Sequence, residues 1–147
     1  MKIQVVQNSS NDEVVLEIHC KEVNNEVESL IELINSHHLT IQGKDENGTI
    51  VLSIKNIYYF EAVDNRVFAY LKENVFEVDY KIAELNELLA NTSFIQISRT
   101  VILNIVNVNR IKTLVNGRMM VELNNGEKQI ITRLYAKTFK DKLKGGK

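Results

Sequence analysis

The chain has 147 residues, of which 44% are apolar and 25% charged, which suits one compact domain with a modest appendage and excludes a disordered or fibrous protein. No apolar run is long enough to cross a bilayer or to act as a secretory signal, so we expect a cytoplasmic protein. The single cysteine, Cys20, excludes an internal disulfide and lacks the spacing of a zinc site, so we expect an ordinary buried hydrophobic residue there.

Charge is distributed unevenly along the chain. The formal net charge is −1, yet residues 1–43 carry a local charge of −5 and the part from Arg99 onward carries +8. All five arginines follow residue 60, namely Arg66, Arg99, Arg110, Arg118 and Arg133. A basic part of this kind can attract phosphates while the whole chain stays near neutral, although charge alone equally fits a solvated basic face.

Residues 1–41 are predicted to form a small acidic strand–strand–helix element. The strands are Lys2–Gln7 and Val14–Cys20, separated by a polar turn. Asn25 and Glu28 resemble a capping box at the start of the helix, and its apolar residues at helical spacing are Val27, Leu30, Ile31 and Ile34. The element is too small to bury this stripe alone, so it must pack on the rest of the chain or on a second subunit. We expect a role in dimerisation or signal input.

From Leu39 onward, short apolar runs alternate with Asn-Gly pairs at 47–48, 116–117 and 125–126, which are typical of type I′ hairpins. The predicted strands are Leu39–Gln42, Thr49–Ser53, Ile57–Val63, Val67–Lys72, Val75–Val78, Phe94–Ser98, Ile111–Val115, Met119–Leu123 and Glu127–Ile131. No strand–helix–strand rhythm is present, which excludes a doubly wound parallel sheet. The pattern therefore predicts a mainly β fold, α+β overall, made of antiparallel sheets with short helices.

Two helices are predicted among these strands. Lys81–Ala90 places an apolar stripe on one side, formed by Ile82, Leu85, Leu88 and Leu89. Near the end of the chain, Thr132 can cap a helix that begins at Arg133, with Tyr135, Phe139 and Leu143 on its apolar face. A helix start offers unpaired N–H groups and partial positive charge, so Arg133 is placed where phosphate contact and base recognition can be combined.

No arrangement of residues supports an enzyme, a metal site or a cofactor. The sequence contains no glycine-rich phosphate loop, no GxSxG or HExxH motif and no Cys/His pair with ligand spacing. Ser98 has an arginine beside it but no nearby histidine, so it has no support as a nucleophile. The sequence therefore favours a binding function.

Three stretches resemble, in order and spacing, the LytTR DNA-binding domain over about residues 42–144. They are IKNIYYFEAVDNRVFAYLKENVFEV (54–78), KIAELNELLANTSFIQISRTVILNIVNVNRI (81–111) and VELNNGEKQIITRLYAKTFKDKL (121–143). Within them, FIQISRTVILN is similar to the family's phenylalanine-led motif and ITRLYAKTFK to its terminal SR-x-Y motif. The resemblance implies that residues 42–147 form an elongated stack of antiparallel sheets, and that double-stranded promoter DNA with paired direct repeats is bound by loops in successive major grooves.

The resemblance also implies roles for individual residues. Arg99 and Arg133 occupy base-reading positions, and Asn65 or Arg66 is the base-reading residue of a third loop. Residues near these loops are candidates for phosphate contact or support, namely Ser98, Asn104, Gln129, Tyr135 and Lys137. Two copies on two repeats imply a homodimer at least on DNA. No obligatory small molecule is implied, and a membrane-protein regulator is left open.

The sequence departs from the family pattern at several points. Gln96 and Ser98 stand where an arginine and a histidine are usual, which removes two cationic contacts, whereas Thr132 in place of serine keeps the capping hydroxyl. Only about 40 residues precede the match, so we expect a stand-alone regulator without a phosphoaccepting receiver domain.

Other interpretations remain open at this point. Arg66, Arg99 and Arg133 also fit ordinary surface or ion-paired arginines, and Asn104 also fits a residue that satisfies the backbone of a turn. The main alternative function is a protein-interaction module with a basic surface and no sequence-specific DNA binding. A small-molecule sensor and an enzyme have still less support.

Overall fold

The computed structural model describes residues 1–145, so the predicted domain end at residue 147 lies outside the described residues. The helices are α1 Asn25–His38, α2 Ile82–Leu88 and α3 Arg133–Gly145, with 3-10 turns η1 Ile54–Asn56, η2 Ile105–Asn107 and η3 Val115–Gly117. The strands are β1 Thr40–Asp45, β2 Gly48–Ser53, β3 Tyr59–Val63, β4 Arg66–Tyr70, β5 Val75–Val78, β6 Phe94–Gln96, β7 Val101–Asn104, β8 Val108–Thr113, β9 Met119–Leu123 and β10 Lys128–Ile131. The predicted mainly β fold is confirmed.

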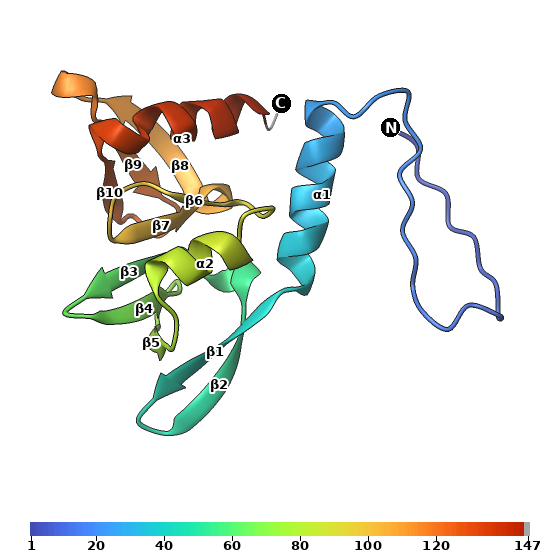
Figure 1. Ribbon diagram of the computed structural model, residues 1–147, viewed down its shortest axis with the longest axis horizontal. Helices are drawn as coiled ribbons and strands as arrows, with labels where there is room; N and C mark the ends of the chain where they lie inside the picture. Colours follow the sequence, from blue (N-terminus) through green and yellow to red (C-terminus); the bar gives the residue numbers. More distant parts are fainter. Residues whose placement is uncertain (146–147) are drawn as a thin grey trace.

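The strands within the described residues form two antiparallel sheets that stack along the molecule (Figure 1). The larger sheet has the order β2-β1-β5-β4-β3-β7-β6, and the smaller has the order β10-β9-β8. Helix α3 packs on the core of the smaller sheet, whereas α2 packs on the larger. The elongated stack implied by the family resemblance is therefore present.

Alternation along the central strands creates two cores on opposite faces of the larger sheet. In β3, Phe60 faces the core shared with α2, and its neighbour Tyr59 faces the core shared with β9 and α3. In β7, Ile102 joins the first core, while Val101 and Leu103 join the second. Because successive side chains of a strand point to opposite faces, one sheet serves as the wall between both cores.

Strand β7 was absent from the sequence prediction. Its residues, Val101–Asn104, are all buried, so the apolar run shows no alternation between buried and exposed positions. A strand covered on both faces produces this continuous pattern. The hairpin predicted at 47–48 is present, but its turn residues are Glu46 and Asn47, because Gly48 already pairs with Asp45.

The prediction for residues 1–24 was wrong in several respects. No strand forms over Lys2–Gln7 or Val14–Cys20, and Cys20 is exposed and not buried. Both errors have one physical cause, since these residues lie beyond α1 and pack against no sheet of the same chain (Figure 1). The helix cap is Asn24 and not Asn25, because Asn24 has extended backbone and its side chain accepts the Val27 N–H at 3.1 Å.

Candidate nucleic-acid interface

The turn between β6 and β7 carries Ser98 and Arg99 and is held closed from within. The N–H of Ile97 donates to the carbonyl of Val101 at 3.0 Å, and the Ser98 hydroxyl accepts the N–H of Thr100 at 3.3 Å. Ile97 is itself fully buried in the second core. The exposed Arg99 side chain therefore projects from a backbone that is fixed on both sides.

The same turn is hydrogen-bonded to the loop before α3 and to strand β3. The N–H and the hydroxyl of Thr132 donate to the carbonyl of Ile97 at 3.0 and 3.4 Å, and Thr132 immediately precedes Arg133. On the other side, the N–H of Ala62 in β3 donates to the carbonyl of Thr100 at 2.9 Å. Strand β3 leads into the turn at 64–65, so the three loops singled out from the sequence lie at the same end of the stacked sheets (Figure 1). We call this end the loop cluster: residues 64–66, 98–100 and 132–133.

The β3–β4 turn is a two-residue turn of the type I′ kind. Val63 pairs with Arg66, and the two residues between them, Asp64 and Asn65, have positive φ values of 52° and 64°. Both types tolerate this left-handed conformation better than other non-glycine residues do. Asn65 is consequently presented at the exposed tip of a tight hairpin.

Arg66 is engaged within the free protein. Its Nε and one terminal nitrogen donate to the two carboxylate oxygens of Glu77 at 3.0 and 2.9 Å, and the guanidinium lies 5.2 Å from the centre of the Phe68 ring. The hydrogen bond from Arg66 lowers the pKa of the Glu77 carboxyl, and the same bond raises the pKa of Arg66. Of the predicted base-reading residues, Arg66 is thus the one whose charge is already paired.

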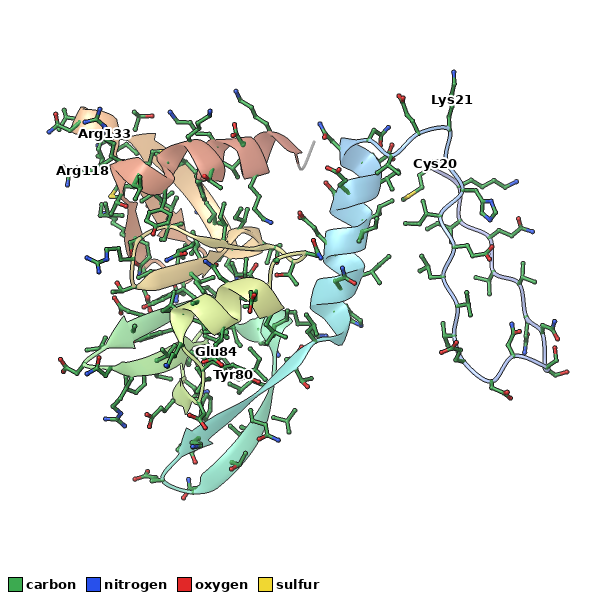
Figure 2. All side chains as sticks on the ribbon, in the orientation of Figure 1. Cys20, Lys21, Tyr80, Glu84, Arg118 and Arg133 are labelled. Atoms are coloured by element: carbon green, nitrogen blue, oxygen red, sulfur yellow. The ribbon has the colours of Figure 1, made fainter. Side chains whose placement is uncertain are left out.

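Arg133 opens α3 and lies over the η3 turn. A Cβ atom on Gly117 would sit 3.0 Å from Cγ of Arg133, so the arginine packs directly on the glycine. Gly117 follows Asn116, and both have positive φ, as the Asn-Gly signal predicts. Figure 2 shows Arg118 and Arg133 at the same corner of the molecule, and both are exposed.

Arg118 was not among the predicted contact residues. The signal that could have found it is an arginine directly after a hairpin turn, but a turn alone does not reveal which other loop lies beside it. The contact between Gly117 and Arg133 brings Arg118 next to the helix start. It therefore adds one exposed guanidinium to those of Arg99 and Arg133.

The predicted phosphate-contact residues differ in accessibility. Asn104 is 0% exposed: its amide donates to the Ile57 carbonyl at 3.0 Å, and its oxygen accepts from the Ser93 hydroxyl at 2.7 Å. Asn104 is therefore too buried to contact a phosphate. It has instead the other role considered for it, which is to satisfy the backbone of a turn. The remaining residues keep exposed surface, with Ser98, Gln129 and Tyr135 partly exposed and Lys137 fully so.

Exposed arginines on loops that are tied to one another, at one end of stacked antiparallel sheets, have the features of a mainly β DNA-binding domain. Within residues 1–145, no helix is long and apolar enough to span a membrane, and no group of three His, Cys, Asp or Glu side chains could hold a metal ion. The loop cluster is therefore the principal candidate site.

Comparison with known proteins gives the family. The model of the LytTr DNA-binding domain matches residues 47–144. A solved structure, the LytTr DNA-binding domain of a Bacillus cereus protein described as a methyl-accepting/DNA response regulator, has a TM-score of 0.67 at 25% identity and covers 71% of this chain and 95% of that one. The chain belongs to the LytTr DNA-binding domain family, which is a class of DNA-binding domains and not of enzymes.

Full-length relatives are found in Staphylococcus aureus. Two proteins, from strain NCTC 8325 and bovine strain RF122, are 24% and 25% identical over 147 residues, covering 97% of this chain and 98% of each relative. Both are named uncharacterized HTH-type transcriptional regulators. In residues 1–145 of the present chain, however, no two α-helices follow one another without strands between them.

Proposed function

We propose that this protein is a cytoplasmic transcriptional regulator that binds paired repeats in promoter DNA as a homodimer, with loops of each copy in the major groove. The observation that carries the proposal is the loop cluster, in which exposed arginines stand on loops joined through the Ile97 carbonyl and the Thr100 carbonyl. Membership of a DNA-binding domain family and the names of the full-length relatives support it. The +8 charge from Arg99 onward supplies attraction for phosphates.

Arg99 and Arg133 are the main base-reading residues in this proposal. Each guanidinium is exposed and offers two parallel N–H donors, which match the O6 and N7 acceptors of guanine. At the third loop we assign base reading to Asn65, because its amide is exposed at the turn tip whereas Arg66 is paired with Glu77. An asparagine amide matches the N6 and N7 atoms of adenine.

The surrounding polar residues position the domain without reading sequence. Ser98, Gln129, Tyr135 and Lys137 contact phosphates in this proposal, and the N-terminal end of α3 adds its unpaired N–H groups and partial positive charge. Arg118 joins them as a further cationic contact beside Arg133. Asn104 supports the site by holding the backbone near Ile57 and Ser93.

The test is fluorescence anisotropy with DNA from the protein's own promoter and with a shuffled duplex, at rising salt concentration. Arg99→Lys and Arg133→Lys keep the positive charge but remove the planar fork. We expect each variant to lose about 1 to 3 kcal/mol of promoter preference, while its affinity for the shuffled duplex changes little.

Arg110→Lys is the matched control, because Arg110 is an exposed arginine on β8 outside the loop cluster. It should retain the parent's preference for the promoter. If promoter and shuffled DNA bind equally weakly, and all three variants behave like the parent, the regulator proposal fails. In that event the protein-interaction module becomes the better interpretation of the basic surface.

A further inference from the structure

Residues 1–24 form two extended arms on the side of α1 that faces away from the sheets (Figure 1). The arms are joined by a tight turn, in which the N–H of Asn11 donates to the Asn8 carbonyl at 3.1 Å and the hydroxyl of Ser10 donates to the Asn8 side chain at 2.8 Å. Every side chain of the arms except that of Ile18 is exposed. The turn predicted from sequence is therefore present, but the arms that it joins are not buried by any other part of the described chain.

The arms carry consecutive apolar residues that no other part of the described chain covers. In the first arm, Ile3, Val5 and Val6 are exposed, and Val5 is 87% exposed. In the second arm, Val14, Val15 and Leu16 follow one another, and Val14 is 98% exposed. Since an isolated two-stranded hairpin is only marginally stable in water, these apolar side chains call for a further surface.

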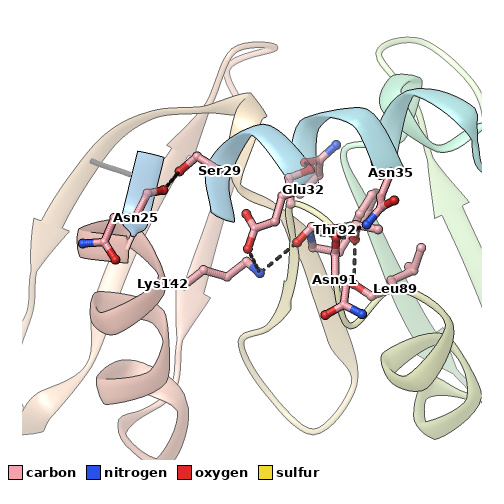
Figure 3. A network of polar contacts seen from close by, with 11 residues as sticks. Asn25, Ser29, Glu32, Asn35, Leu89, Asn91, Thr92 and Lys142 are labelled. Carbon is pink, nitrogen blue, oxygen red and sulfur yellow. Dashed lines mark hydrogen bonds and ion pairs between the residues drawn. The ribbon is translucent and has the colours of Figure 1, made fainter. Parts of the chain in front are cut away.

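Helix α1 holds these arms at a fixed place on the domain (Figure 3). The ammonium of Lys142 in α3 lies 3.4 Å from a carboxylate oxygen of Glu32 in α1 and donates to the Thr92 carbonyl at 2.8 Å. The Asn35 amide donates to the Asn91 carbonyl at 3.3 Å. One face of α1 is thus bonded to the domain, whereas Ile31 and Leu33 remain exposed.

The exposed apolar area is large enough for a stable interface. Its side chains in residues 1–24 are Met1, Ile3, Val5, Val6, Val14, Val15, Leu16 and Val23. At about 60 to 120 Å² for each side chain, two copies would bury on the order of 1,000 to 2,000 Å². Stable specific interfaces bury about 1,200 to 2,000 Å², and a monomer seldom exposes an apolar patch beyond a few hundred Å².

We propose that the arms are the homodimer interface, where the arms of two copies cover each other's apolar side chains. This inference rests on the proposed function, which needs two copies on two repeats. The arms leave α1 on the side away from the loop cluster, so pairing through them leaves the arginines free. The two relatives from Staphylococcus aureus align over 97% of this chain. The alignment therefore includes the N-terminal segment as well as the DNA-binding domain.

The experiment measures the mass of the full chain without DNA by sedimentation equilibrium over a range of concentrations. The test variant is Val5→Asp with Leu16→Asp, at exposed apolar positions of both arms. The matched control is Gln4→Asp with His19→Asp, which places the same charges in the same arms at polar positions. Because the arms pack on no part of the domain, we expect the domain to remain folded and to unfold cooperatively in all three proteins.

We expect twice the chain mass for the parent and for the control, and at least a tenfold weaker dimer for the test variant. A nitroxide on Cys20, the only cysteine, should show coupling between chains in the parent and lose it in the test variant. A parent with the mass of one chain would overturn the proposal, as would a dimer that both variants leave intact. A dimer without promoter preference would instead overturn the proposed function alone, and a monomer with promoter preference would overturn this inference alone.

Discussion

Gly117 controls where the Arg133 side chain can lie. Its φ is +76°, and a Cβ there would meet Cγ of Arg133 at 3.0 Å. We predict that Gly117→Ala costs about 1 kcal/mol of stability, because a left-handed conformation strains any L side chain, and that it also weakens promoter preference by displacing Arg133. Urea unfolding and anisotropy on the same variant measure the two effects.

Gly126→Ala is the control that separates backbone strain at a glycine from displacement of the Arg133 side chain. Gly126 also has positive φ, at +88°, but nothing lies within 4 Å of its added Cβ. It should therefore lose a similar amount of stability and retain full promoter preference. Equal losses of preference in the two variants would contradict the assigned role of the Gly117 contact.

The contact between Gly117 and Arg133 marks a boundary of what sequence can predict. The Asn-Gly turn at 116–117 and the helix beginning at Arg133 were each predicted and are each present. Their contact depends on how two hairpins stack, and no local pattern encodes that distance. Arg66 shows the same limit, since Glu77 lies on the next strand of the chain, β5, and only the register in which β4 pairs with β5 brings the two side chains together.

At the scale of elements, one hydrogen bond joins the larger sheet to the β9–β10 turn. The Tyr59 hydroxyl in β3 donates to a carboxylate oxygen of Glu127 at 2.7 Å, and the Tyr59 ring stacks on Tyr70 with centroids 4.4 Å apart. Burial, followed by the bond to Glu127, raises the pKa of the Tyr59 phenol above its ordinary value of 10. The folded state therefore holds this proton more tightly than the unfolded chain does.

We predict that this tyrosine makes the fold sensitive to alkali. Its contribution is fully present below pH 10 and is lost as the pH rises further, because only the unfolded chain ionises readily there. Tyr59→Phe should cost about 1 kcal/mol at neutral pH and should flatten the fall in melting temperature above pH 10. Glu127→Gln keeps a hydrogen-bond acceptor for the Tyr59 hydroxyl, so its stability should lie between that of the parent and that of Tyr59→Phe. Parallel alkaline losses in the parent and Tyr59→Phe would refute the assignment.

The elements that sequence failed to predict share a cause. Strand β7 is covered by both cores, which removes the alternation by which half-buried strands are recognised. The arms are rich in apolar residues but pack on no sheet of the same chain, so they remain extended without forming a ladder. Periodicity therefore reports which faces are apolar, whereas pairing decides whether a strand exists.

At the scale of the whole molecule, charge is separated along its length. Residues 1–43 carry a local charge of −5 and the part from Arg99 onward carries +8, and Figure 2 places Arg118 and Arg133 at one end and the arms with Lys21 at the other. We predict that Lys137→Gln reduces the slope of log affinity against log salt concentration by about 1 for promoter and shuffled DNA alike, because a phosphate contact carries no sequence information. Lys21→Gln should leave the slope unchanged. An unchanged slope for Lys137→Gln would remove this residue from the phosphate contacts.

The Ile97 carbonyl has a consequence for the DNA itself. By accepting two hydrogen bonds from Thr132 while Ile97 closes the neighbouring turn, it fixes the separation between the backbones that carry Arg99 and Arg133. In the proposed complex, the protein would therefore hold the two base-reading arginines at a fixed spacing along the DNA. A half-site with one base pair inserted between the two positions could not be accommodated by moving one loop, so the duplex itself would have to twist or bend, and its stiffness would become part of the selectivity.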